Sequence, residues 1–308
     1  MRQTRGVRHV ILSILLACGL CAVCDRAGAE PPVFPLPALT PAETARIDSV
    51  IAGFPPRDDQ PHVFFIGFAG YGGERVFSEE IQFAARQVDA RFATGPRTLL
   101  LINDKRDAER WPMASHENLR YALSAVGRVM EPSRDLLFLA LSSHGGSNGL
   151  LEVSNFNLQP SGLGARRLAG WLNEAGIRQR IVVVSACYSG AFLKPLANNE
   201  TIVITAARHD RSSFGCSDRR ELTYFGEAFY RDSLPHAPTL RLAFERTAAL
   251  IQSREADERV RRSLPQAYFG YLLEGRLVPQ GSSVAPISQR SHSRAAPRPS
   301  LMAQTTSD

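Results

Sequence analysis

The chain has 308 residues, of which 44% are hydrophobic, 21% charged and 8% aromatic, and this composition excludes collagen, a wholly disordered chain and a small disulfide-stapled scaffold. The formal net charge is +6, but residues 1–29 and 281–308 hold all of it except +1, which belongs to residues 30–280. Because nucleic-acid binding needs a concentrated basic face on the folded part, we expect no nucleic-acid partner. The length suffices for one large α/β domain or two small ones.

The first 29 residues have the pattern of a secretory signal peptide. Three arginines in residues 1–9 precede an apolar run over residues 10–23, which is too short to span a bilayer comfortably. Ala27-Gly28-Ala29 then follows as a cleavage site of small residues. As an alternative, Leu15-Leu16-Ala17-Cys18 resembles a bacterial lipoprotein box with a lipid anchor on Cys18. Both interpretations predict an exported protein, periplasmic or secreted, without a membrane span.

Residues 30–60 contain seven prolines and predict an extended lead-in with one short helix over 42–52, capped by Thr40 and begun by Pro41. From residue 62 on, β-rich apolar runs alternate with amphipathic stretches. In chain order, the expected elements are a strand over 62–68, a helix over 74–92, a strand over 98–102, a helix over 116–130, a strand over 135–141, a helix over 162–175, strands over 180–185 and 201–205, helices over 221–230 and 239–253, and a last strand over 268–273.

Strand–helix alternation with continuous apolar strands predicts a three-layer α/β/α sandwich with a mainly parallel central sheet. We expect this domain to cover residues 61–280. The Ser-, Arg-, Ala- and Pro-rich tail over 281–308 has too few large apolar groups to offset the entropy of ordering, so we expect it to be disordered. In parallel sheets, active sites lie beyond the carboxyl ends of the strands, and the strand exits are therefore the places to look for chemistry.

The first strand exits into a glycine-rich stretch over 67–73. A dinucleotide-binding loop would need a third glycine where Arg75 stands, so we interpret this stretch as a tight turn. His62, His116, His209 and His236 show no metal-ligand spacing. His209-Asp210 is interpreted as a solvated loop pair. We therefore expect neither a cofactor nor a metal.

Two other strand exits carry groups suited to nucleophilic catalysis. The strand over 135–141 leads to His144 and Gly145, and the strand over 180–185 leads to Cys187. If these strands are neighbours, a thiol and an imidazole emerge side by side as a nucleophile and a base. The backbone N–H groups of Gly145 and Cys187 then point at a developing oxyanion. The alternative is that His144 is a hydrogen-bonded surface residue and Cys187 is buried filler.

These segments resemble the legumain family of cysteine endopeptidases. The resemblance is carried by Ser143-His144-Gly145-Gly146, by Ser185-Ala186-Cys187-Tyr188-Ser189-Gly190, and by two blocks over 205–216 and 223–227. It covers roughly residues 62–232 and implies a caspase-like fold. It also implies His144 as general base, Cys187 as nucleophile, and a substrate pocket near Ser185, Ser212 and Glu227.

Three departures from the family pattern affect the site. Ser185 stands where legumains have a glutamate, Gly72 stands where they have the asparagine that orients the histidine, and Ser78-Glu79 replaces an Arg-His pair. If Glu227, with or without Glu79, lines the pocket, an unpaired carboxylate would favour Arg or Lys in the substrate over Asn. The alternative for Glu79 is that it faces solvent on its helix.

Cysteine usage leaves two interpretations open. Cys18, Cys21 and Cys24 lie in the leader, so simple cleavage leaves Cys187 and Cys216. In an exported protein these two residues are expected to form one disulfide, unless one of them is a working thiolate. The resemblance implies a structural thiol at Cys216, and a cystine with Cys187 would be an oxidised, inactive form.

The resulting hypothesis is an exported cysteine endopeptidase that cleaves protein or peptide substrates through a Cys–His dyad and a thioester. A transpeptidase with the same dyad and an inactive peptide-binding or scaffold relative are the alternatives. A serine hydrolase using Ser189 lacks the Gly-x-Ser-x-Gly pattern, because position 187 is Cys. Activation stays open, since residues 30–60 fit an inhibitory lead-in and a spacer equally well.

Overall fold

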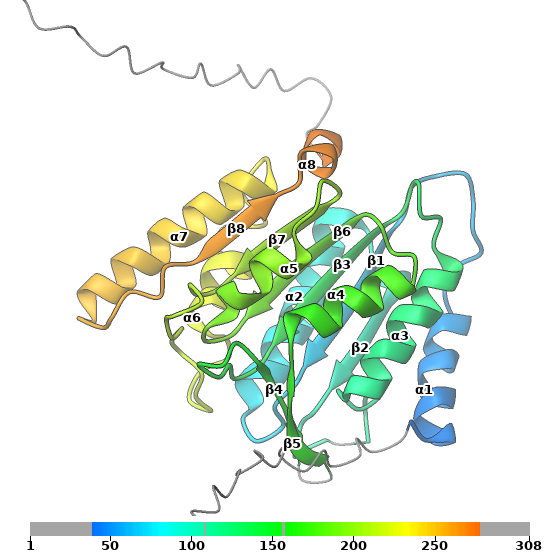
Figure 1. Ribbon diagram of the computed structural model, residues 1–308, viewed down its shortest axis with the longest axis horizontal. Helices are drawn as coiled ribbons and strands as arrows, with labels where there is room; N and C mark the ends of the chain where they lie inside the picture. Colours follow the sequence, from blue (N-terminus) through cyan, green and yellow to red (C-terminus); the bar gives the residue numbers. More distant parts are fainter. Residues whose placement is uncertain (1–38, 108, 156–157, 278–308) are drawn as a thin grey trace, which may run out of the picture. The chain divides into compact units, whose positions relative to one another are not determined.

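The computed structural model of the chain describes residues 39–107, 109–155 and 158–277. Its central sheet has the strand order β2-β1-β3-β6-β7-β8 (Figure 1). Strands β2, β1, β3, β6 and β7 pair in parallel, and β8 runs antiparallel to β7. The strands of this sheet are β1 (Val63–Ala69), β2 (Thr98–Ile102), β3 (Leu136–Ser142), β6 (Arg180–Ser185), β7 (Thr201–Thr205) and β8 (Gln266–Phe269). Strands β4 (Leu151–Asn155) and β5 (Leu158–Leu163) form a separate two-stranded sheet.

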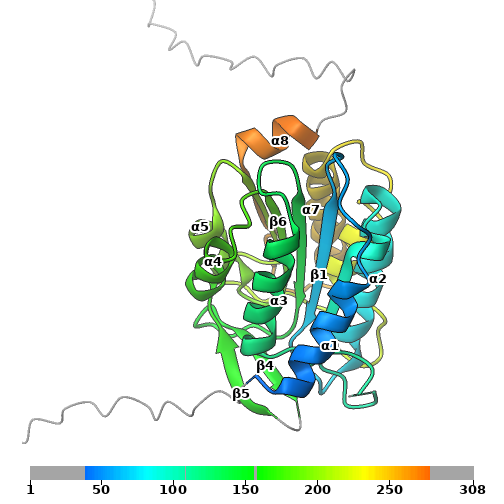
Figure 2. The same ribbon diagram turned by 90° about the vertical axis from the view of Figure 1, so that its right-hand side faces the viewer.

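Helices cover both faces of the sheet, which confirms the predicted three-layer α/β/α sandwich (Figure 2). Because both faces are covered, every residue of β3 and β6 is buried, and the strands read as unbroken apolar runs in the sequence. One face packs against α1 (Pro41–Ala52), α3 (His116–Val129), α4 (Ala165–Glu174) and α5 (Leu193–Leu196). The other packs against α2 (Arg75–Phe92), α6 (Tyr224–Gly226), the π-helical turn η3 (Glu227–Arg231) and α7 (Leu240–Asp257).

The helix α1 starts as its sequence predicts. Thr40 accepts a hydrogen bond from the backbone N–H of Glu43 at 3.2 Å, and Pro41 occupies the first helical position, where a missing N–H costs nothing. Ile47 of this helix is fully buried in the core that α3 and the sheet share. The packed unit therefore includes α1, which the sequence assigned to a lead-in ahead of the domain.

Several short elements differ from the sequence-based expectation. The helix expected from residue 162 begins at Ala165, because the residues before it form a hairpin of β4 (Leu151–Asn155) and β5 (Leu158–Leu163). The last strand ends at Phe269 and is followed by a short helix, α8 (Tyr271–Leu277), in place of the strand expected up to residue 273. The 3₁₀ turns are η1 (Gly95–Arg97) and η2 (Ser189–Phe192). These elements are too short for hydrophobic periodicity to identify them.

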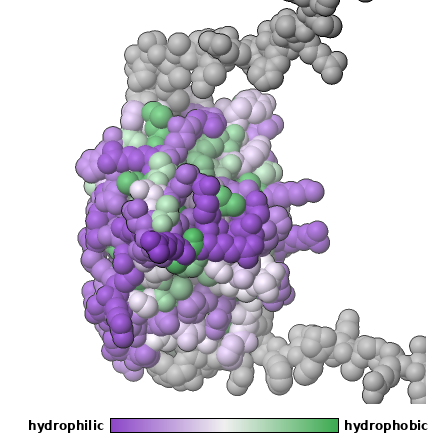
Figure 3. Space-filling model, turned by 90° about the vertical axis from the view of Figure 1, so that its left-hand side faces the viewer, coloured by the Kyte–Doolittle hydropathy of each residue, from purple (hydrophilic) through white to green (hydrophobic). Residues whose placement is uncertain are grey.

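The sheet edge at β8 and α7 faces the viewer in Figure 3, and charged and polar side chains dominate this surface. Among the helices of the described ranges, none has the length and apolar character needed to cross a bilayer. The predicted leader over 1–29, with its Cys18, and the predicted disordered tail over 281–308 lie outside the described residues.

Candidate active site

His144 and Cys187 follow the ends of two neighbouring strands. Each lies two residues after a member of the same paired position in the sheet. Ser142, the last residue of β3, is the partner of Ser185, the last residue of β6. The backbone N–H of Ser143 extends this ladder by donating to the carbonyl of Ser185 at 3.2 Å. His144 and Cys187 each follow two residues later, so parallel pairing brings both to one edge of the sheet, as their strand exits predicted.

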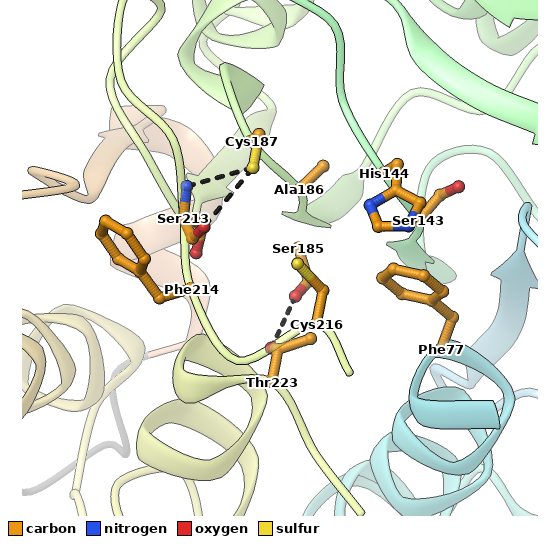
Figure 4. Close-up of a pocket in the computed structure, with 10 residues that line it drawn as sticks. All are labelled: Phe77, Ser143, His144, Ser185, Ala186, Cys187, Ser213, Phe214, Cys216 and Thr223. Atoms are coloured by element: carbon orange, nitrogen blue, oxygen red, sulfur yellow. Dashed lines mark hydrogen bonds between the residues drawn. The ribbon is translucent and has the colours of Figure 1, made fainter. Parts of the chain in front are cut away.

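At this edge a small pocket lies between the ends of β3 and β6, the start of α2 and the loop after residue 212. His144 and Cys187 stand on opposite sides of it (Figure 4). No Asp, Glu, Lys or Arg of the described residues belongs to its lining. The lining residues are Phe77, Ser143, His144, Ser185, Ala186, Cys187, Ser213, Phe214, Cys216 and Thr223.

Cys187 is a half-buried free thiol held by one residue of the opposite loop. Its Sγ accepts a hydrogen bond from the backbone N–H of Ser213 at 3.3 Å and lies 3.4 Å from the carbonyl oxygen of the same residue, to which the thiol donates (Figure 4). These contacts keep the sulfur at the rim of the pocket.

Cys216 lines the same pocket and is also a free thiol, so no disulfide joins it to Cys187. The structure therefore agrees with two free thiols and not with a disulfide between Cys187 and Cys216. Burial, with a smaller contribution from the nearby Cys187, raises the pKa of Cys216 to about 11. Cys216 is thus protonated and unreactive at neutral pH.

Gly145 is required by the close packing of the two strand exits. A Cβ at this position would lie 1.9 Å from the carbonyl oxygen of Cys187 and 3.2 Å from its backbone nitrogen. Only glycine permits such an approach. Within the described ranges, the N–H groups of Gly145 and Cys187 donate no hydrogen bond to a protein acceptor. Two N–H groups without a protein acceptor therefore lie on the closely packed exits of β3 and β6, and their role as oxyanion donors stays a prediction.

His144 is held by two aromatic rings and one carboxylate. Its ring makes edge contacts with Tyr71 and Phe77, at centroid distances of 4.8 and 4.9 Å. Its Nε2 lies 3.3 Å from Oε2 of Glu74. Gly72 supplies no side chain where the resembling family has its orienting asparagine, and the carboxylate comes from a residue two positions later. The sequence reasoning missed Glu74, although an acidic residue at the exit of the first strand was a usable signal.

A second carboxylate that the sequence reasoning missed lies beneath the pocket. Glu80 of α2 is fully buried. It accepts hydrogen bonds from the hydroxyl of Ser142 at 3.0 Å, and from the backbone N–H and hydroxyl of Thr223 at 3.0 and 2.5 Å. The hydroxyls of Thr223 and Ser185 are 3.1 Å apart and form the pocket floor (Figure 4). Burial raises the pKa of Glu80, although the hydrogen bonds from Ser185, Thr223 and Ser142 oppose it.

The carboxylates that were expected in the pocket lie elsewhere. Glu79 lies outside the lining and 3.8 Å from Arg106 at the surface. Glu227 contacts three arginines, with N···O distances of 2.5 Å to Arg220, 2.7 Å to Arg254 and 3.3 Å to Arg231. Burial raises the pKa of Glu227, but these arginines outweigh it and lower the pKa below its usual range. The expectation of an unpaired carboxylate in the pocket is therefore wrong, and with it the physical reason for preferring Arg or Lys.

The other predicted site residues divide between the pocket and its surroundings. Ser185 lies on the pocket floor. Ser212 lies outside the pocket lining, with its hydroxyl oxygen 3.5 Å from that of Tyr188, the residue after the nucleophile. The hydroxyl of Ser189 is buried and accepts the N–H of Ala207 at 3.1 Å, so it is not available as a nucleophile.

The described residues offer no rival site built on a metal or on another histidine. Asp210 pairs with Arg208 and Arg211, and this leaves His209 without the carboxylate that its sequence neighbour suggested. Among these residues, no group of three or more His, Cys, Asp or Glu side chains is arranged to hold a metal ion.

Comparison with known proteins matches the chain to a protein family and to solved structures. The model of the Peptidase C13 family, which is the legumain family, matches residues 116–274, more than half of the chain. No curated protein matches the chain. The crystal structure of caspase-1 from Spodoptera frugiperda is similar in fold, with 11% sequence identity, a TM-score of 0.49, and coverage of 71% of this chain and 90% of that one.

The matched range contains the three elements of the sequence resemblance: the His144 exit, the Cys187 exit and the blocks that follow. It begins with α3, and the loop that carries Glu74 lies before it. The resemblance to legumains is therefore confirmed, and the chain belongs to the Peptidase C13 family of cysteine peptidases.

Proposed function

We propose that the protein is an exported cysteine endopeptidase in which Cys187 is the nucleophile and His144 the general base. The observation that supports the assignment most directly is the shared pocket, which has the thiol on one side and the imidazole on the other. No hydrogen bond joins the two side chains within the described residues. In the proposed reaction a peptide carbonyl enters between them, and loose contacts of this kind tighten when substrate binds.

In the acylation step, His144 takes the proton of the Cys187 thiol, and the resulting thiolate attacks the carbonyl carbon of the scissile bond. The carbonyl electron pair moves to the oxygen, which receives hydrogen bonds from the N–H groups of Gly145 and Cys187. When the intermediate collapses, the C–N bond breaks, and the imidazolium returns its proton to the leaving amine. The product is a thioester on Cys187 and a free peptide amine.

The thioester is then resolved by a second nucleophile. Water, deprotonated by His144, gives a carboxylic acid and regenerates the thiol, which is hydrolysis. An amine in place of water gives a new amide bond, which is transpeptidation through the same intermediate. We propose hydrolysis as the main reaction, in line with the peptidase family of the chain.

Export is the second part of the proposal. It is supported by the arginine-rich start, the apolar run over 10–23 and the cleavage pattern at Ala29. A lipid anchor at Cys18 stays an alternative, which mass measurement of the mature protein isolated from membranes distinguishes from simple cleavage. Both routes deliver the peptidase domain outside the cytoplasm, where protein and peptide substrates meet it.

An inactive peptide-binding relative is the competing function, suggested by the missing orienting asparagine at Gly72. Purified protein should be incubated with a peptide library beside Cys187→Ala and His144→Ala, and new termini identified by mass spectrometry. The proposal predicts cleavage by the wild type, and loss of at least about 100-fold in rate in both variants. Peptide binding without cleavage by the wild type, or full activity of either variant, would overturn it. Addition of an amine acceptor separates hydrolysis from transpeptidation.

A further inference from the structure

Glu74 has an unusual environment for an ionisable side chain. Its Oε2 is buried and accepts no hydrogen bond within the described residues, although Nε2 of His144 lies 3.3 Å away. The separation suits an ion pair, but the direction of the ring N–H does not yet meet the requirements of a hydrogen bond. A buried carboxylate oxygen without a donor is costly unless a proton-bearing partner completes it.

The position of Glu74 in its helix does not explain this environment. Glu74 is the N-cap residue of α2, with extended backbone angles, but its side chain makes no capping hydrogen bond. The N–H of Arg75, the first of the helix, donates to Asp218 at 2.7 Å. Since another residue caps this end of the helix, the carboxylate of Glu74 is left to face the imidazole.

The aromatic contacts decide which ring nitrogen meets which partner. Tyr71 and Phe77 pack edgewise against the ring of His144, at interplanar angles of 67° and 76°, and limit its rotation. With Nε2 on the side of Glu74, Nδ1 is the nitrogen left to receive a proton from Cys187. A carboxylate at the distal nitrogen selects the tautomer with the proton on Nε2 and stabilises the imidazolium that forms when Nδ1 is protonated.

We propose that Glu74 is the positioning residue for His144 and takes the role that an asparagine has in the resembling family. Glu74 does not touch the substrate; it acts through the imidazole by holding Nε2–H and by balancing the positive charge on the ring during acylation. This inference rests on the proposed function, since it requires His144 to be the base. It also explains how the chain can use the dyad with glycine at position 72.

The titratable groups that face His144 come from four segments, because Cys216 belongs to the loop after β7 and Cys187 to the exit of β6. Glu74 stands at the start of α2, Tyr71 belongs to the loop after β1, and Cys187 with Cys216 lines the pocket beyond β6. Of these groups, Glu74 is the carboxylate that lies within ion-pair distance of the imidazole, at 3.3 Å. Removing it should therefore change how activity depends on pH, and a merely structural contact would leave this dependence unchanged.

The test compares Glu74→Gln, Glu74→Asp and Glu174→Gln by steady-state kinetics over pH 5–9 on a peptide that the wild type cleaves. Glu174 is the matched control, because it forms an exposed ion pair with Arg120 at 3.0 Å on α4, away from the pocket. We expect Glu74→Gln to lower kcat on the order of 10- to 100-fold with little change in KM. Its acid limb should move to lower pH, because His144 must be neutral to act as the base and its protonated form loses its counter-charge. Glu74→Asp should recover part of kcat.

A double variant isolates the route of the effect. Glu74→Gln should cause no further loss in the His144→Ala background, because the carboxylate acts through the imidazole. If Glu74→Gln behaves like Glu174→Gln in kcat and in pH profile, the inference is wrong even though the dyad stands. If His144→Ala is fully active, the proposed function itself fails. Should Glu74→Gln not fold, as judged by circular dichroism, Glu74→Ala replaces it, and a wild-type kcat and pH profile in that variant would equally overturn the inference.

Discussion

Gly145 lies directly against the carbonyl oxygen of Cys187, so that a Cβ on the glycine would come within 1.9 Å of it. This contact joins the exits of β3 and β6 behind the pocket. It places the backbone after the histidine beside the backbone of the nucleophile. The spacing between the candidate oxyanion donors therefore depends on Gly145 having no side chain.

Gly145→Ala should damage both activity and stability. The clashing atom belongs to backbone, which has no rotamer to adopt, so the two strand exits must separate. We expect a loss of about 1–3 kcal/mol in the free energy of unfolding, as for other overpacked sites, and a fall in turnover. Chemical denaturation and peptide cleavage measure the two effects.

Gly170→Ala is the control for Gly145→Ala. A Cβ at Gly170, inside α4, meets nothing within 4 Å, so alanine should stabilise the helix by about 0.5–1 kcal/mol and leave activity unchanged. If Gly145→Ala matches the wild type in both measurements, the close approach of the two exits is not required.

The two cysteines should differ sharply in reactivity. With a pKa of about 11, Cys216 is ionised in about one molecule in 10⁴ at pH 7, whereas the proposed role of Cys187 requires a readily formed thiolate. Iodoacetamide at neutral pH, followed by peptide mass spectrometry, should label Cys187 first. Cys216→Ser should leave both labelling of Cys187 and peptide cleavage intact. Preferential labelling of Cys216 would contradict this assignment.

The substrate residue on the acyl side of the cut bond should be uncharged. No Asp, Glu, Lys or Arg of the described residues lines the pocket, and its floor carries the hydroxyls of Ser185 and Thr223. A charged substrate side chain would lose its hydration there without gaining a partner of opposite charge. Profiling with a positional peptide library should therefore disfavour Arg, Lys, Asp and Glu.

Glu227→Gln is the companion variant for this profile. Because Glu227 is already balanced by three arginines, its neutralisation should leave the order of preferred substrate residues unchanged. A strong preference of the wild type for Arg or Lys that disappears in Glu227→Gln would restore the carboxylate pocket expected from the sequence.

Glu80 should make stability depend on pH with a sign opposite to that of an ordinary paired carboxylate. Burial raises its pKa above the usual 4.5, so the folded state binds the proton more tightly than the unfolded state. Its contribution is present in full below pH 4.5 and is lost as the pH rises through the folded-state value. Urea unfolding at a series of pH values should show this loss in the wild type and not in Glu80→Gln.

Glu80→Ala tests the structural part of the same network. It removes the acceptor for the buried N–H of Thr223 and for two hydroxyls, so it should cost about 2–4 kcal/mol, more than the isosteric Glu80→Gln. Equal stability of the two variants would show that these hydrogen bonds contribute little.

The main elements could be predicted because their signals are local. The strands β1, β3, β6 and β7 are continuous apolar runs, since both faces of the sheet are covered, and α1 carries its own cap in Thr40 and Pro41. The β4–β5 hairpin was not predicted, because its strands have only five and six residues and too little periodicity. The helix expected over 221–230 is present as α6 and the π-helical turn η3.

The pairing of His144 with Cys187 follows from the sequence for a related reason. Each residue stands just beyond an apolar run, and parallel strands that are neighbours end at the same edge of the sheet. The amino-acid order thus places a thiol and an imidazole at two strand exits, and the pairing of β3 with β6 brings them to one rim. It also contains the glycine at position 145 that their approach requires.

The charges around this pair were settled by packing between elements far apart in the chain. Whether Glu74, Glu79 or Glu80 meets the site depends on the rotation of α2 about its axis, and this rotation is set by the whole apolar face that the helix buries against the sheet. Neutralisation of Glu227 likewise needs Arg254, which α7 brings from 27 residues away. Local sequence patterns say little about such contacts, because the energy that selects them comes from burial of the entire core.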